Sequence, residues 1–381
     1  MDIQTIVPAE RSAGQPLAML RFLLTSSVRC AWRSFKNCIG VLIGRKPHIH
    51  PRDLFLWRFI LHLTDIRPIR QITCTGLKHE GAGSQAHMIM SAINFARASG
   101  LTYVHTPFSL IHHADRPMDE WVAVWEAFFN LGDGETTCIP EEHRPVDYCY
   151  NRSSLELCFG WADPRNELSR RFNELIPEFK RKYYQGKKTG IKNEFTVAVH
   201  IRRGDVSETF NSHRFTGTDA IAKTVAAAKS ILDSRKIAHT LRIYSQGSPT
   251  EFAELAALDV DLNLDADPVR TMQEMIEADV LIMAKGCFSN YAGMISDGIK
   301  LFDPAALAGS RMPGWWHFSP PDDWLPCHPD GSFDHAAFER QLSCLICAKG
   351  AEGQIRTTGS GQVSSIRATN VEGFDGKTRI R

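Results

Sequence analysis

The sequence predicts an α/β fold made of two units, each with a parallel sheet, that face a common cleft. From residue 71 onward, short apolar runs alternate with amphipathic stretches of about 10–15 residues, which is typical of parallel strands joined by crossover helices. A basic, glycine-containing stretch over 185–192 separates two such series. The length of 381 residues suits two domains of ordinary size. Clefts between domains are favoured ligand sites.

The first unit is expected over residues 71–190 and the second over 191–310. In the first unit we expect strands at 72–77 and 101–105, helices at 83–99, 119–131 and 167–184, and an irregular stretch over 132–165. In the second unit we expect strands at 196–201, 241–244, 260–264, 280–284 and 300–302, and helices at 218–233, 249–257, 269–277 and 290–295. A helical segment over 311–347 follows. The tail over 348–381 has few apolar residues, so we expect it to be disordered.

Composition and charge indicate a soluble globular chain. Hydrophobic residues make up 43% and charged residues 23%, and the formal net charge of +1 argues against a general nucleic-acid-binding surface. Ten cysteines over this length are too sparse for a disulfide scaffold. Cys344 and Cys347 form a C-x-x-C without a partner pair, which favours thiols over a zinc site.

Residues 1–70 are basic, with 11 Lys/Arg against 4 acids, and carry apolar residues at helical spacing. Such a helix can lie on an anionic membrane surface or pack on the main body, and the sequence leaves both open. No apolar run reaches the roughly 18 residues of a membrane span, and residues 1–13 do not resemble a secretory signal. We therefore expect a cytoplasmic protein with peripheral membrane contact as an option.

The most informative segment is Val197-Ala-Val-His-Ile-Arg-Arg-Gly-Asp205. It reads as a buried parallel strand that ends in a charged loop, where open α/β sheets bind ligands. Guanidinium groups such as those of Arg202 and Arg203 can each hold two phosphate oxygens, so the pair predicts a diphosphate site. Gly204 allows close backbone approach, and Asp205 is expected to orient an arginine.

Two further segments begin helices after predicted strands. Ser289 stands at the start of one and is expected to cap it, with the free N–H groups of that turn attracting an anion. Gly81-Ala-Gly-Ser-Gln-Ala86 begins the other, and is a glycine-rich turn rather than a dinucleotide fingerprint, because the third glycine is absent.

Acids and histidines outside these segments supply weaker candidates. The carboxylates of Asp259/Asp261 and Asp265/Asp267 could hold a divalent ion, but they also suit a solvated strand and turn. His112-His113 and His79-Glu80 lie in predicted loops, and either could supply a general base to an acceptor hydroxyl.

Together, these segments resemble the fucosyltransferase superfamily, whose fold of two Rossmann-like domains is called GT-B. His200-Ile-Arg-Arg-Gly-Asp205 resembles its H-x-R-R-x-D signature. Gly81-Ala-Gly-Ser-Gln85 resembles the G-x-G-N-Q of the bacterial α-1,2 type, and the stretch from Thr271 to Ser289 is similar to that type's D-M-Q…S-T-F-S-W-W region. The resemblance covers roughly residues 71–305.

The resemblance implies an inverting, metal-independent enzyme that transfers fucose from GDP-fucose to a saccharide hydroxyl. A separate idea, from the basic segment over 1–70, is docking on a membrane that carries a glycolipid acceptor. The resemblance also implies that Arg202 stabilises the leaving β-phosphate and that Arg203 supports it or contacts the donor. The other implied donor-side residues are His200, Ser289 and Thr271, which stands where the family has the aspartate that reads guanine. The implied cleft and acceptor-side residues are Gly81, Gly83, Ser84, Gln85 and His79. Asp205 and His79 are the candidates for the general base.

Two alternatives stay open at this point. One is a metal-dependent sugar-nucleotide transferase that uses the paired aspartates. The other is a homologue that binds saccharide or nucleotide without turnover, since Thr271 and Asn290-Tyr291 depart from the family pattern.

Overall fold

The computed structural model describes residues 69–76, 80–137, 145–159, 164–187, 194–304 and 319–351. Most of the predicted basic extension over 1–70 and of the tail over 348–381 lies outside these residues, and so does His79. No helix in the described part of the chain is both long and apolar enough to cross a membrane.

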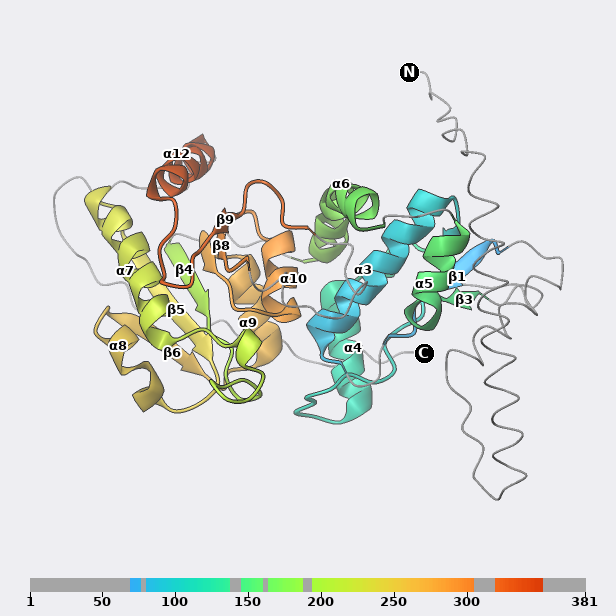
Figure 1. The fold of residues 1–381 in the computed structure, drawn as a ribbon, viewed down its shortest axis with the longest axis horizontal. Coiled ribbons are helices and arrows are strands. Elements are labelled where there is room, and N and C mark those ends of the chain that lie inside the picture. Colours follow the sequence, from blue (N-terminus) through green and yellow to red (C-terminus); the bar gives the residue numbers. More distant parts are fainter. Residues whose placement is uncertain are drawn as a thin grey trace.

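The first unit contains a three-stranded parallel sheet in the order β2-β1-β3, and Figure 1 shows β1 and β3 beside α5. Its strands are β1 (Gln71–Thr73), β2 (Thr102–Tyr103) and β3 (Val146–Asp147). Its helices are α3 (Ala82–Ser99), α4 (Met118–Phe129), α5 (Tyr148–Cys158) and α6 (Pro164–Tyr184). The expectation of an irregular stretch over 132–165 is wrong, because β3, α5 and the start of α6 lie there.

The second unit contains a six-stranded parallel sheet in the order β6-β5-β4-β7-β8-β9. Its strands are β4 (Phe195–His200), β5 (His239–Ser245), β6 (Val260–Leu264), β7 (Val280–Ile282), β8 (Ile299–Phe302) and β9 (Leu325–Pro326). Its helices are α7 (Thr218–Ser234), α8 (Ala253–Ala256), α9 (Pro268–Ile276), α10 (Cys287–Ile295) and α12 (His335–Ala351), with short 3-10 helices η1 (Ser212–Arg214) and η2 (Pro249–Phe252). The predicted α/β fold with parallel sheets is confirmed.

Strand β4 is buried on both faces, which explains its continuous apolar sequence. Val197 and Val199 lie in one core with α7, α8 and α12, whereas Ala198 lies in the other core with α9 and α10. Counted within this unit, the strand order is 3-2-1-4-5-6, the doubly wound order, and it reverses between β4 and β7. This reversal places the ends of β4 and β7 side by side, with their following loops leading to opposite faces.

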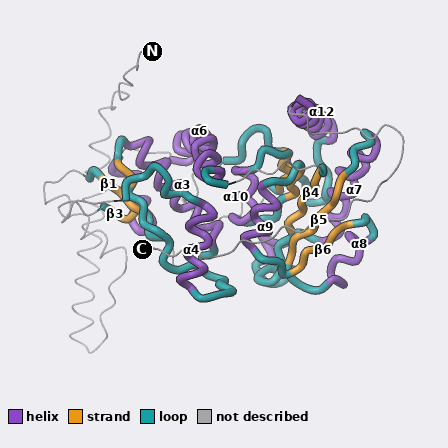
Figure 2. Tube along the Cα trace, turned by 180° about the vertical axis from the view of Figure 1, so that it is seen from behind, coloured by secondary structure: helices purple, strands orange, loops and turns teal. Residues whose placement is uncertain are grey.

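The two units share one of these cores. Helices α9 and α10 cover one face of the six-stranded sheet, and α10 also contacts α3 and α6 of the first unit. Figures 1 and 2 show α10 lying between α9 and the helices of the first unit. The described elements therefore form one continuous structure, in which α3 and α10 meet directly.

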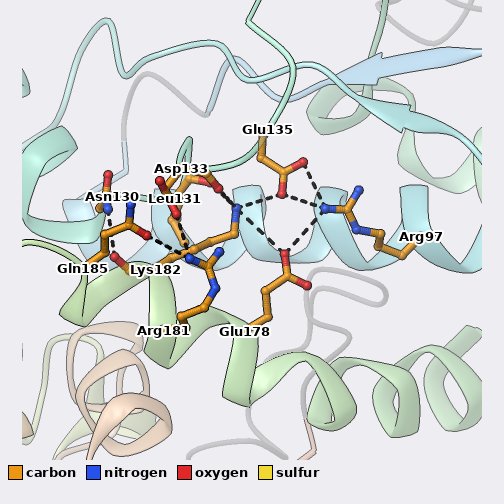
Figure 3. Close-up of polar contacts among 9 residues, drawn as sticks. All are labelled: Arg97, Asn130, Leu131, Asp133, Glu135, Glu178, Arg181, Lys182 and Gln185. Atoms are coloured by element: carbon orange, nitrogen blue, oxygen red, sulfur yellow. Dashed lines mark hydrogen bonds and ion pairs between the residues drawn. The ribbon is translucent and has the colours of Figure 1, made fainter. Parts of the chain in front are cut away.

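A buried ion pair stabilises the first unit (Figure 3). The Lys182 ammonium and the Glu135 carboxylate lie 2.8 Å apart, with side chains 1% and 2% exposed. Lys182 Nζ also donates to the backbone carbonyls of Leu131 and Asp133, and Arg97 contacts Glu135 at 3.0 Å. The loop after α4 is thus fixed to α6 and α3 by charge-assisted hydrogen bonds.

Replacing the buried lysine tests this network. Lys182→Ala is expected to lower the free energy of unfolding by about 3 kcal/mol, because it leaves Glu135 and two carbonyls without their buried donor. The control is Arg181→Ala, which removes an exposed pair with Asp133 and should cost no more than about 1 kcal/mol. Urea unfolding measures both variants, and equal losses would contradict the assignment.

Candidate functional site

The candidate site lies at the carboxyl ends of β4 and β7, where the strand order reverses. Ligands of open α/β sheets bind in the crevice outside such a reversal. After β4 the chain continues into Arg202, Arg203 and Asp205, and after β7 it turns through Gly286 into α10. The structure therefore brings two of the predicted segments to one edge of the sheet.

Arg202 is held by Asp205 three residues later. Its Nε and Nη2 donate to the two carboxylate oxygens at 3.1 and 2.6 Å, and its side chain is 23% exposed. These hydrogen bonds lower the pKa of Asp205 below its usual value, so the carboxylate stays ionised at neutral pH. A Cβ on Gly286 would lie 2.5 Å from Nη1 of Arg202. Glycine at position 286 thus lets the start of α10 approach the guanidinium.

Arg203 points to the other side and is buried. Its Nη1 donates to the carbonyl of Arg202 at 2.9 Å, and its Nη2 donates to the carbonyl of Thr216 at 3.1 Å and to the Thr218 hydroxyl at 3.0 Å. The guanidinium also lies 4.4 Å from the ring centroid of Phe215. These contacts fix the site loop to the start of α7.

Ser289 does not cap α10, contrary to the sequence expectation. Gly286 is the N-cap residue, and Ser289 is the third residue of the helix and fully buried. Its hydroxyl oxygen accepts a hydrogen bond from the Ala284 N–H at 3.1 Å and lies 2.5 Å from Nδ1 of His200. Burial and the nearby Arg202 lower the pKa of His200 to about 3, so this imidazole is neutral and joins β4 to α10.

The glycine-rich segment lies directly against the start of α10. Gly81 is the N-cap residue of α3, and a Cβ on Gly83 would lie 2.9 Å from the backbone of Phe288. The Ser84 side chain hydrogen-bonds to Cys287. Gln85 is buried and donates to the carbonyls of Glu80 and Leu110 at 2.8 and 2.7 Å. These residues join the two units, and Gln85 ties the α3 turn to the loop before α4.

Thr271 is buried on α9, and the nearby Asp267 has partners of its own. Asp267 Oδ1 accepts from the Arg270 N–H at 2.8 Å and caps α9, while its Oδ2 contacts Arg116 at 2.8 Å. Arg116 comes from the first unit, so this ion pair bridges the units. The sequence gives no signal for it, because the two residues lie far apart in the chain and in different predicted elements.

The histidine pair of the first unit lies beside the start of α3. His112 N–H donates to the carbonyl of Glu80 at 3.1 Å, and a Cβ on Gly81 would lie 3.9 Å from the His113 ring. His113 is exposed and adopts a left-handed backbone with φ 62°. Partial desolvation and His112 lower the pKa of His113, and the charges of Asp205 and Arg202 also act on it, so its imidazole is neutral at pH 7.

A pocket extends from the arginines along the ends of β4, β7 and β8. Arg202, Arg203, Arg214, Asp303 and His328 contribute polar groups to its lining. Sequence reasoning missed Arg214 and Asp303, which follow no recognisable motif.

The paired aspartates are not joined by a third metal-ligating side chain among the described residues. Asp259 and Asp265 occupy left-handed turns at either end of β6, with φ 58° and 51°. Among the described residues, no group of three His, Cys, Asp or Glu side chains could hold a metal ion.

No family model matches this chain, and no curated protein matches it. Among solved structures, the chain is similar to the fucosyltransferase NodZ from Bradyrhizobium, with 12% identity and a TM-score of 0.33 over 60% of this chain and 94% of that one. It is also similar to POFUT1 in complex with GDP-fucose, with 14% identity and a TM-score of 0.29 over 60% of this chain and 93% of that one.

The contact between α3 and α10 can be tested with a pair of glycines. Gly83→Ala is expected to lower the free energy of unfolding by about 1–3 kcal/mol, because its methyl group would overlap the backbone of Phe288. In the matched variant Gly81→Ala the new methyl group meets its nearest atom at 3.9 Å, so the loss should stay below about 1 kcal/mol. Urea unfolding compares the two, and a Gly83→Ala protein as stable as the parent would argue against this contact.

Proposed function

We propose that this chain is a glycosyltransferase of the GT-B type. It transfers a sugar, fucose from GDP-fucose, to a saccharide hydroxyl in carbohydrate biosynthesis, with inversion at the anomeric carbon and without a metal ion. The observation that carries the proposal is the position of Arg202, which lies at the strand reversal of the second sheet, oriented by Asp205 and adjacent to the N-terminus of α10.

The proposed reaction breaks the bond between the anomeric carbon and the β-phosphate oxygen. Negative charge then grows on the departing diphosphate, and a guanidinium that is already in place stabilises it without reorganisation. The N-terminus of α10 adds to the positive potential at the same edge. The donor's base would extend toward the start of α9, where Thr271 lies.

The acceptor oxygen attacks from the opposite face of the sugar, and its proton passes to a base. Asp205 is a poor base, because Arg202 lowers its pKa. We therefore assign Asp205 the role of orienting Arg202, and His113 the role of receiving the proton. His113 is neutral at pH 7 and approaches the pair from the first unit, the proposed acceptor side.

Arg202→Ala is expected to reduce turnover by about 10²–10³-fold, because the leaving diphosphate loses its preformed donor. Release of GDP from GDP-fucose in the presence of a saccharide panel measures the rate. The control Arg235→Ala removes an arginine at the end of α7 that contacts Ser343, far from the strand reversal, and should leave the rate unchanged. Full turnover by Arg202→Ala, or loss of activity on chelation, would contradict the proposed mechanism.

His113→Asn tests the base and preserves the left-handed backbone, which asparagine tolerates. We expect kcat/KM to fall by about 10²-fold or more and the acidic limb of its pH profile to disappear. In the parent protein that limb should lie below pH 6.5, since the pKa of His113 is lowered and the base acts only when deprotonated. The variant of the neighbouring residue, His112→Asn, should retain the acidic limb. If the acidic limb were lost in His112→Asn and kept in His113→Asn, the base would be His112.

Residues 1–70 are included in the proposal only as a basic segment for peripheral contact with an anionic membrane that carries a glycolipid acceptor. The proposed compartment is the cytoplasm. Co-sedimentation with anionic vesicles, compared between the full chain and a chain without residues 1–68, tests the contact, and unchanged binding would exclude it.

A further inference from the structure

Two cysteines of the first unit lie next to each other at the carboxyl edge of its sheet. Cys74 directly follows β1, and Cys149 is the second residue of α5, directly after β3. Their sulfur atoms are 2.7 Å apart, little more than the roughly 2.05 Å of a disulfide bond. Both are free thiols in this structure.

The surrounding backbone holds the two thiols in place. β1 and β3 are paired in parallel, with Thr73 opposite Asp147. The Asp147 carboxylate accepts a hydrogen bond from the Thr75 hydroxyl on one side and from the Cys149 N–H, at 3.0 Å, on the other. One side chain thus bridges the two turns that carry the cysteines, so a bond between them requires little movement.

The two thiols differ in access to solvent. Cys74 is fully buried, and that burial raises the pKa of its thiol, as does the adjacent Cys149. Cys149 is only partly buried. An oxidant from solution therefore reaches Cys149 first, and Cys74 is the resolving partner inside.

We propose that Cys74 and Cys149 are a reversible disulfide site. With a glutathione disulfide as oxidant, the Cys149 thiolate attacks one of its sulfurs and releases one glutathione thiolate. The Cys74 thiolate then attacks the Cys149 sulfur of the mixed disulfide and releases the second glutathione. Two protein thiols are oxidised, one disulfide is reduced to two glutathiones, and their protons balance.

The bond would join residues that are 75 positions apart in the chain. It would also fix the segment that leads to the start of α3, since Gly76 lies against the side chain of Gln85. Closing so long a loop removes conformations mainly from the unfolded chain, so oxidation should stabilise this unit. The inference does not depend on the proposed transferase activity.

The test uses the full-length protein equilibrated with oxidised or reduced glutathione. The sample is quenched in acid, alkylated, digested and mapped by mass spectrometry. We expect a linked Cys74–Cys149 peptide after oxidation that disappears on reduction, and a rise in Tm of about 5–10 °C in the oxidised protein.

Two variants complete the test. Cys149→Ser should abolish both the linked peptide and the oxidation-dependent shift in Tm, whereas Cys344→Ser, at an exposed cysteine of α12, should retain both. The proposal is overturned if both thiols of the parent protein are still free after oxidation, so that both are recovered in alkylated form. It is also overturned if either thiol is joined only to glutathione or to another cysteine. This readout needs no variant, so it stands even if Cys149→Ser does not fold.

Discussion

The direct contact between the first turns of α3 and α10 is the constraint on which the candidate site depends. Helix α10 begins just beyond the carboxyl end of β7. Because its first turn touches α3 through Phe288 and Gly83, the start of α3 lies beside this edge of the six-stranded sheet. The charges of Arg202 and Asp205 therefore act on His113, although His113 belongs to the other unit.

Packing and charge hold this arrangement from several sides. The core that α9 and α10 share with α3 and α6 buries large aromatic residues such as Trp125 and Tyr291. Arg116 and Asp267 form an ion pair between the units, and Lys180 on α6 contacts Asp297 after α10 at 2.5 Å. Exposed ion pairs contribute little stability each, so the shared core provides most of it and the pairs fix the relative position.

The elements of the second unit could be predicted closely because buried parallel strands read as continuous apolar runs. Except for β9, which lies in the segment over 311–347 that was expected to be helical, its strands and long helices lie within a few residues of the expected ranges. Helix α5 could not be predicted in this way, because polar residues interrupt its apolar pattern. Arg152 and Glu156 are polar in sequence but buried as an ion pair at 2.6 Å, so periodicity does not reveal that face.

The candidate site was predictable where it depends on local sequence and not where it depends on contacts between units. The arginine loop after β4 follows from the strand that precedes it. The prediction that Ser289 caps α10 is wrong because the helix begins at Cys287, two residues before Ser289. The Ser289 hydroxyl therefore turns inward to His200. The approach of His113 depends on how two units pack, which no single segment encodes.

The adjacent arginines have different roles because the alternation of β4 continues past its end. In an extended chain successive side chains point to opposite faces. Ala198, His200 and Arg202 face α9 and α10, as their contacts with that core, with Ser289 and with Gly286 show.

Val197, Val199 and Ile201 face the α7 side, and Arg203 reaches Thr218 at the start of α7. The two adjacent arginines therefore place one guanidinium at the start of α10, the helix after β7. The other guanidinium lies at the start of α7, the helix after β4. Only the Arg202 guanidinium lies beside the start of α10, whereas Arg203 holds the loop to the start of α7, and both side chains line the pocket at this edge of the sheet.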